Sequence, residues 1–169
     1  YGSQYRAMVT CVHEVLDTLK PRFPAYDEKA GYEVAGFVWF QGYNDMIQGG
    51  KPVEEYGANL TCLIKDMRKE FKVPGMKVVV GVMGVNGVRN EDGKQGEIRK
   101  QMRSMNTVPE FKGNVATVYT HDMARGGSGN GHYGGNAKVY MDVGEAMGKA
   151  MIDLLNDNAP GPAAGMGSN

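Results

Sequence analysis

A short polar segment that directly follows an apolar run carries the residues best suited to chemistry. The apolar run spans residues 34–40 (VAGFVWF), and residues 41–45 (QGYND) follow it. A glycine N–H and an asparagine amide can both donate hydrogen bonds to the oxyanion that develops during ester hydrolysis. Gly42 and Asn44 therefore fit that role, although Gly, Asn and Asp are also common in ordinary strand-to-helix turns.

Acyl transfer also requires a base and a group that orients the base. His132 is the best candidate for the base, because it lies in a glycine-rich loop directly before a predicted helix. Asp45 or Asp122 could orient the His132 imidazole, and the sequence does not choose between them. His132 could instead be only a polar residue at the entry to the helix. His13 lies within the first predicted helix and is interpreted as a surface or packing residue.

Two other kinds of site find less support in the sequence. His121 stands beside Asp122 and could form a metal site with His132, but three ligands from two adjacent loops are a weak basis for one. The glycines of residues 126–135 lack the Gly-Lys-Ser/Thr ending of a phosphate-binding loop, which argues against nucleotide binding.

The elements that must position these residues alternate along the chain. Apolar residues at helical spacing predict helices at about residues 4–20, 53–71, 94–105 and 137–156. Buried apolar runs predict strands at residues 34–40, 78–83 and 115–120. This order predicts an α/β fold with a parallel sheet covered by helices on both faces. Right-handed crossovers would bring the polar turns after the strands, including Asn86 after the second strand, to one edge of the sheet.

Length and composition fit a single globular domain. We place this domain at residues 1–156 and expect the Gly- and Pro-rich residues 157–169 to be disordered. The 19 basic residues balance the 19 acidic ones, so neither nucleic acid nor an anionic membrane surface is favoured as a partner. No apolar run approaches the ~18 to 20 residues that span a bilayer. Two cysteines, Cys11 and Cys62, decide neither the compartment nor the redox state.

Residues 39–45 resemble the signature of a known family. Residues 42–45 (Gly-Tyr-Asn-Asp) resemble the Gly-x-Asn-Asp block of SGNH (GDSL-type) hydrolases. Residues 39–42 (Trp-Phe-Gln-Gly) resemble the Trp-x-Gln-Gly signature of the sialate O-acetylesterase-like carbohydrate esterases within that superfamily. His132 and the helix after it resemble the closing histidine block of the family. The resemblance extends over residues 5–155.

This resemblance implies a three-layer α/β/α sandwich with a parallel sheet, of the flavodoxin-like SGNH hydrolase type. It also implies a serine esterase that removes acetyl groups from sugars and uses neither a metal nor an organic cofactor. Carried over by position, Gly42 and Asn44 would be the oxyanion donors and His132 the general base.

The partner that the resemblance implies is an acetylated carbohydrate substrate. We expect Trp39, Gln41, Tyr43 and Asn86 to contact this substrate, since the rings of Trp39 and Tyr43 can stack on a sugar. Members of the family are often exported, so a periplasmic or extracellular location is implied by the resemblance alone.

Two departures from the family pattern concern the rest of the catalytic machinery. The acidic partner of the family usually lies three residues before the histidine, and Gly129 occupies that position here. The family's serine lies in a Gly-Asp-Ser-like block after the first strand, and this chain contains no such block. None of its serines follows a buried strand with that pattern; they are Ser3, Ser104, Ser128 and Ser168.

We therefore interpret the chain as the carboxyl-terminal part of such a domain, without its nucleophile segment and without one or two amino-terminal strands. That segment of the same polypeptide would then be a partner of this chain. The alternative is a non-catalytic glycan-binding or structural module that retains the fold, which Gly129 and the absent serine block both favour. A third possibility, a flavodoxin-like small-molecule binder, is not favoured, because the sequence has no phosphate-loop signature.

Overall fold

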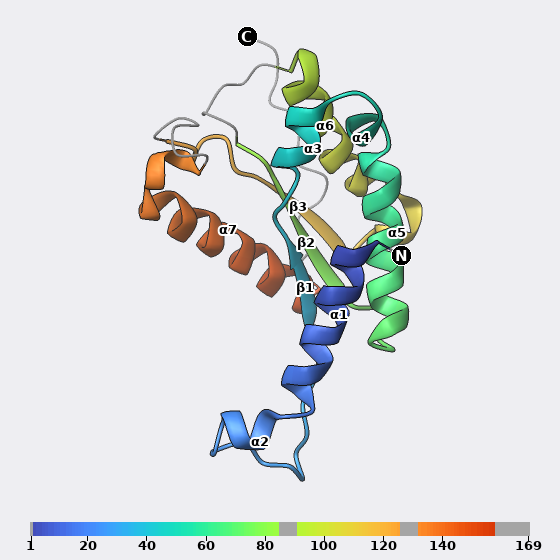
Figure 1. The fold of residues 1–169 in the computed structure, drawn as a ribbon, viewed down its shortest axis with the longest axis vertical. Coiled ribbons are helices and arrows are strands. Elements are labelled where there is room, and N and C mark those ends of the chain that lie inside the picture. The colour runs from blue at the N-terminus through green and yellow to red at the C-terminus, as the bar shows by residue number, and fades with distance from the viewer. Residues whose placement is uncertain (1, 85–90, 126–131, 158–169) are drawn as a thin grey trace. The chain divides into compact units, whose positions relative to one another are not determined.

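The structure is a computed structural model, and it describes residues 2–84, 91–125 and 132–157. The chain forms two compact units, residues 1–33 and residues 34–169, and Figure 1 shows the helices and strands of both. None of the helices within the described ranges is long and apolar enough to cross a membrane.

The first unit contains two helices, α1 (Ser3–Leu16) and α2 (Leu19–Arg22). The sequence predicts one helix that ends before Pro21, but Pro21 lies inside the second, shorter helix. A proline is tolerated there because the first four N–H groups of a helix have no partner within the helix. The single predicted helix is therefore two helices.

The second unit is built on three parallel strands in the order β1–β2–β3. The strands are β1 (Gly36–Trp39), β2 (Lys77–Val82) and β3 (Val115–Tyr119). The helices are α3 (Tyr43–Gln48), α4 (Lys51–Glu54), α5 (Tyr56–Glu70), α6 (Gly93–Arg103) and α7 (Ala137–Leu155). Short 3₁₀ helices are η2 (Ser104–Thr107), η3 (Pro109–Phe111) and η5 (Tyr133–Gly135). Because the strands run the same way, their carboxyl ends share one edge of the sheet.

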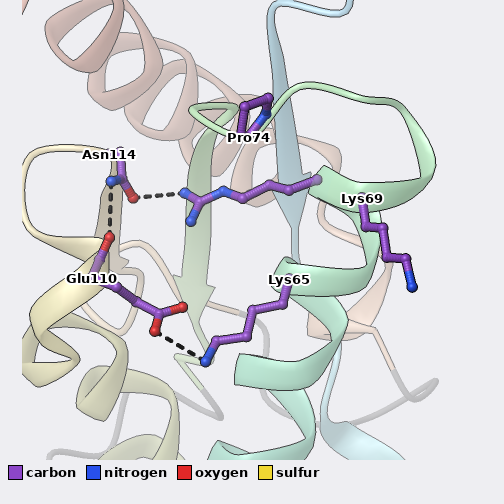
Figure 2. A pocket seen from close by; sticks show the side chains of 6 residues that line it. Lys65, Lys69, Pro74, Glu110 and Asn114 are labelled. Carbon is purple, nitrogen blue, oxygen red and sulfur yellow. Dashed lines mark hydrogen bonds and ion pairs between the residues drawn. The ribbon is translucent and has the colours of Figure 1, made fainter.

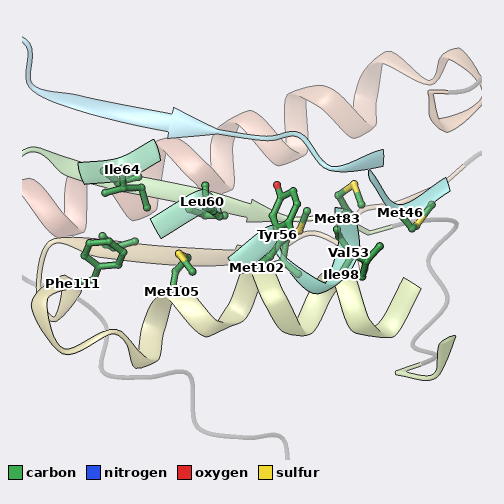
Figure 3. Close-up of a cluster of buried hydrophobic side chains, with 14 residues drawn as sticks. Met46, Val53, Tyr56, Leu60, Ile64, Met83, Ile98, Met102, Met105 and Phe111 are labelled. Atoms are coloured by element: carbon green, nitrogen blue, oxygen red, sulfur yellow. The ribbon is translucent and has the colours of Figure 1, made fainter. Parts of the chain in front are cut away.

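The central strand β2 supplies side chains to two separate cores. Val78, Val80 and Val82 pack on the face covered by α5 and α6, where Figure 3 shows Leu60, Ile64, Ile98 and Met102 among the buried side chains. Val79 packs on the other face, which α7 covers with Val139, Val143 and Met147. Apolar side chains on both faces are typical of a parallel sheet buried between helices. The predicted three-layer α/β/α sandwich is thus confirmed.

Two element boundaries differ from the prediction. The predicted helix over residues 53–71 is divided at Glu55 into α4 and α5, and the first strand is confined to Gly36–Trp39. The high methionine content has a structural use, because the unbranched methionine side chain fills irregular gaps in a core. Buried methionines include Met46, Met67, Met76, Met83, Met102, Met105 and Met147.

Candidate active site

The carboxyl edge of the sheet gathers the polar residues that follow the strands. Residues 41–45 follow β1, Gly84 follows β2, and residues 120–122 follow β3. The parallel pairing of β1 with β2 and of β2 with β3 places all three segments at this edge, as the sequence predicts. Asn86, which we expect to contact the substrate, lies outside the described residues.

The turn of residues 41–45 is held from the core by Tyr56. The Trp39 indole N–H donates a hydrogen bond to the Tyr56 hydroxyl (3.1 Å), and this hydroxyl donates to the Gln41 carbonyl (2.5 Å). Burial raises the pKa of Tyr56 to about 12, with a smaller contribution from the Asp45 charge and an opposing one from the Trp39 hydrogen bond. The hydroxyl therefore keeps its proton at neutral pH and fixes the backbone directly before Gly42.

Gly42 is required at its position for two reasons. Its φ of 147° is one that residues with a side chain rarely adopt. A Cβ there would lie 2.4 Å from Met102 Cε and 3.2 Å from Tyr56 Oη, so these neighbours would have to shift to admit one. The Gln41 carbonyl and the Gly42 N–H belong to one peptide group, so the hydrogen bond from the Tyr56 hydroxyl restrains that N–H. A fixed backbone N–H is what an oxyanion hole requires.

Asn44 and Asp45 lie in the first turn of α3 and differ in their surroundings. Asn44 is exposed, so its amide can reach a ligand at the edge of the sheet. The Asp45 carboxylate accepts a hydrogen bond from the Gln41 side chain (2.9 Å), which ties the two ends of the turn together. Asp45 and Gln41 are therefore hydrogen-bonded to each other in the structure. Whether Asp45 also orients His132 stays a prediction.

The two aromatic residues of the turn contact the core. Trp39 and Tyr43 are partly buried and pack against the cluster under α5 and α6. The Trp39 ring also lies 5.9 Å from the Phe37 ring, centroid to centroid. Their expected stacking on a sugar stays a prediction.

His132 directly precedes Tyr133, and Tyr133 is anchored at the same edge of the sheet. Tyr133 packs against the cluster under α7, and its hydroxyl makes hydrogen bonds with the Gly84 backbone and the Thr120 side chain. Burial raises the pKa of Tyr133, while these two hydrogen bonds lower it. His132 itself is exposed. Tyr133 therefore lies at the ends of β2 and β3, and the exposed His132 is the residue before it in the chain.

His121 and Asp122 face each other at the end of β3. His121 Nε2 lies 2.8 Å from Asp122 Oδ1, and the buried His121 ring lies 4.2 Å from the Tyr119 ring, centroid to centroid. Thr120 lies between Tyr119 and His121 in sequence, and its buried hydroxyl donates to the Val82 carbonyl (2.7 Å). No third His, Cys, Asp or Glu joins the pair to form a metal-binding group within the part of the chain that the structure describes.

Serine is scarce in the second unit. Ser104 is its single serine among residues 34–84, 91–125 and 132–157, and its hydroxyl donates to the Gln101 carbonyl (2.6 Å) at the end of α6. Ser128 and Ser168 lie outside the described residues, as does Gly129. Of the described serines in this unit, none stands beside Gly42 and Asn44.

Sequence reasoning missed the role of Tyr56. Apolar spacing over residues 53–71 predicts only that one face of a helix is buried. The one available signal was chemical, because a buried tyrosine hydroxyl usually has a hydrogen-bond partner. The pairing partners, Trp39 and Gln41, lie 17 and 15 residues away in sequence and could not be predicted from helical spacing.

The fold and this edge define an α/β protein whose polar residues gather at the carboxyl edge of a parallel sheet, where ligands bind in such folds. A family model described as "carbohydrate esterase, sialic acid-specific acetylesterase" matches residues 2–153. The chain therefore belongs to the sialic acid-specific acetylesterase family of carbohydrate esterases, and the resemblance seen in residues 39–45 is confirmed. No curated protein and no solved structure matches the chain.

Proposed function

We propose that this chain supplies the oxyanion donors and the general base of a serine-type carbohydrate O-acetylesterase. The observation that carries the proposal is the turn of residues 41–45, in which Tyr56 restrains the peptide group between Gln41 and Gly42 while Asn44 is left exposed. The substrate would be an acetylated sugar, since membership of the family supports hydrolysis of acetyl esters of carbohydrates.

In the proposed reaction a serine Oγ attacks the acetyl carbonyl carbon, and its proton passes to the His132 imidazole. The carbonyl oxygen becomes an oxyanion that accepts hydrogen bonds from the Gly42 N–H and the Asn44 amide. The intermediate collapses, and the departing sugar oxygen takes the proton from His132. Water then attacks the acetyl-serine in the same way, with His132 again as base, and releases acetate.

We further propose that the serine belongs to a segment outside these 169 residues, amino-terminal in the same polypeptide. The support is that none of the four serines of the chain follows a buried strand with the family's pattern. The chain alone should then hydrolyse p-nitrophenyl acetate little faster than buffer. Ser168→Ala serves as a control for Ser128→Ala. Brisk turnover that Ser128→Ala abolishes and Ser168→Ala preserves would overturn this assignment.

A second candidate function is a non-catalytic glycan-binding module. It is favoured by the contacts of the two candidate acids, because Asp45 accepts a hydrogen bond from Gln41 and Asp122 faces His121. Calorimetry with an O-acetylated sialic acid would test it. Binding without hydrolysis, both by this chain and by a longer polypeptide that contains it, would favour the module over the esterase. Hydrolysis by the longer polypeptide would exclude the module.

A further inference from the structure

A cavity of about 380 Å³ opens at the amino edge of the sheet, at the opposite end of the strands from Gly42 and Asn44 (Figure 2). It is open to solvent and is bordered by the last two turns of α5, the loop before β2, η3 and the residue before β3. Its lining consists of Lys65, Arg68, Lys69, Pro74, Glu110 and Asn114. Three of these side chains are basic and one is acidic, although the chain as a whole carries no net charge.

Arg68 is the fixed cation of this cavity. Only 9% of the residue is exposed, and its Nε and Nη2 both donate to the Met76 carbonyl (3.2 and 2.9 Å). Nη2 also donates to the Asn114 side chain (2.6 Å), and the guanidinium lies 5.2 Å from the centre of the Phe111 ring. An arginine held on several sides in this way loses little freedom when it meets a ligand.

The charges around Arg68 do not balance. Lys65 Nζ lies 3.0 Å from Glu110 Oε2, and Figure 2 shows this ion pair across the cavity. That pair neutralises one lysine and leaves the charges of Arg68 and Lys69. Burial lowers the pKa of Arg68, and the Glu110 charge opposes this effect. A further negative charge in the cavity would therefore stabilise a guanidinium that burial disfavours.

We propose that this cavity binds an oxyanion group of the carboxylate, sulfate or phosphate class. Arginine and lysine recognise such groups through charge-assisted hydrogen bonds. The volume falls within the ~300 to 1,000 Å³ of small-molecule sites, so the group can belong to a monosaccharide or be a free ion. The inference does not depend on the proposed esterase function, because the cavity and the residues 41–45 lie at opposite ends of the strands.

Basic residues at the end of a helix also have a purely structural role. Arg68 and Lys69 lie in the last turn of α5, where positive charge stabilises the helix macrodipole. This role predicts that replacing Lys69 lowers stability slightly and leaves the response to anions unchanged. Anion binding instead predicts that replacing Lys69 weakens the response to anions, so the two explanations can be separated.

The test is a ¹⁵N–¹H NMR titration of the chain with sodium sulfate, sodium phosphate, sodium glucuronate and uncharged glucose at constant ionic strength. We expect saturable shifts of the Lys69 and Asn114 amides with at least one anion and none with glucose. Response to glucuronate alone would identify an acidic saccharide as the source of the group, and response to the inorganic anions alone would identify a free ion. No saturable shift with any anion would overturn the proposal.

Charge-reversal variants make the test specific to this cavity. Lys69→Glu should weaken the anion affinity about three- to tenfold, the size expected for reversing one exposed charge. Lys100→Glu on α6 makes the same charge change at a side chain that is 75% exposed and does not line the cavity, and it should leave the affinity unchanged. Equal weakening by both variants would show a response to net charge only and would contradict a site here. Arg68 is unsuitable as the first variant, because its loss would unpair the Met76 carbonyl and Asn114.

Discussion

The turns after β1 and β3 end at the same edge of the sheet but use their polar residues in opposite ways. In residues 41–45, Tyr56 fixes the backbone from inside and Asn44 is exposed. In residues 120–122, the Thr120 hydroxyl and the His121 ring are themselves buried. A group that stabilises a transition state must be both fixed and accessible to the substrate. In the first turn the exposed Asn44 is accessible to a substrate, whereas the buried Thr120 and His121 side chains of the second turn brace the fold.

His121 and His132 differ in exposure in the same way. His121 is 6% exposed and lies against Tyr119, while His132 is exposed beside the anchored Tyr133. A base must reach the hydroxyl of the nucleophile, so accessibility favours His132 for the chemistry and His121 for structure.

The largest effect should come from His132→Ala in an acetylesterase that contains this chain. We expect kcat to fall by at least about a thousandfold, because the residual rate then depends on binding and the oxyanion donors alone. His121→Ala should instead lower the free energy of unfolding, by roughly 1 to 3 kcal/mol, through loss of a buried side chain. Hydrolysis rates and urea denaturation of both variants measure this difference. Near-normal turnover by His132→Ala would refute its role as base.

Asn44→Ala should have the next largest effect on the same reaction. Loss of one oxyanion donor typically lowers kcat about 10² to 10³-fold. Because Asn44 is exposed, the free energy of unfolding should stay within about 0.5 kcal/mol of the original. Gln48→Ala, also exposed and on the same helix, is the matched control and should leave kcat unchanged. A loss of less than about fivefold for Asn44→Ala would remove this residue from the oxyanion hole.

Tyr56→Phe should loosen the turn of residues 41–45 while it keeps the ring in the core. The Trp39 N–H and the Gln41 carbonyl would each lose a partner, so we expect the free energy of unfolding to fall by about 1 to 3 kcal/mol. Thr61→Val on the same helix, which removes a hydroxyl bonded to the Gly57 carbonyl, controls for a general effect of losing a hydrogen bond. The amide exchange of Gly42 should accelerate in Tyr56→Phe and not in Thr61→Val.

Alkaline pH tests the burial of the Tyr56 hydroxyl by a stability measurement, with no activity assay. Tyr56 holds its proton more tightly in the folded protein, where its pKa is about 12, than in the unfolded chain, where it is 10.0. Its contribution is therefore complete below pH 10 and is lost as the pH rises to 12. Urea denaturation should show a decline over that range that is smaller in Tyr56→Phe by roughly 1 to 3 kcal/mol. Equal declines in both proteins would assign the effect to other tyrosines.

Hydrophobic spacing predicts most of the fold because it reports which face of each element is buried. The three apolar runs became strands of one parallel sheet, and the helical stripes became its two covering layers. The break at Glu55 escaped prediction, because residues on both sides of it keep apolar spacing. The prediction that a helix ends before Pro21 was wrong, because a proline is tolerated in the first turn of a helix and Pro21 lies in the first turn of α2.

The candidate site was only partly predictable. Glycine and amide residues after a buried strand pointed to Gly42 and Asn44, but the side chains that surround Gly42 come from α5 and α6. The cavity around Arg68 was missed altogether, because its partners Met76 and Asn114 lie 8 and 46 residues away. Such pairings arise from the packing of elements and leave no local pattern in the sequence. The acid that would orient His132 is still a prediction for the same reason.

The central claim is that Gly42 and Asn44 form an oxyanion hole, and binding of acetate, the expected product, tests it. A ¹⁵N–¹H NMR titration with sodium acetate follows the Gly42 amide and the Asn44 side-chain amide. It uses the Lys69→Glu variant, because this substitution should weaken acetate binding in the cavity at the amino edge of the sheet. We predict saturable shifts of both signals, with a Kd in the range of about 1 to 100 mM for so small a ligand. Asn44→Ala should weaken the binding. Unchanged Gly42 and Asn44 signals at saturating acetate would contradict the account.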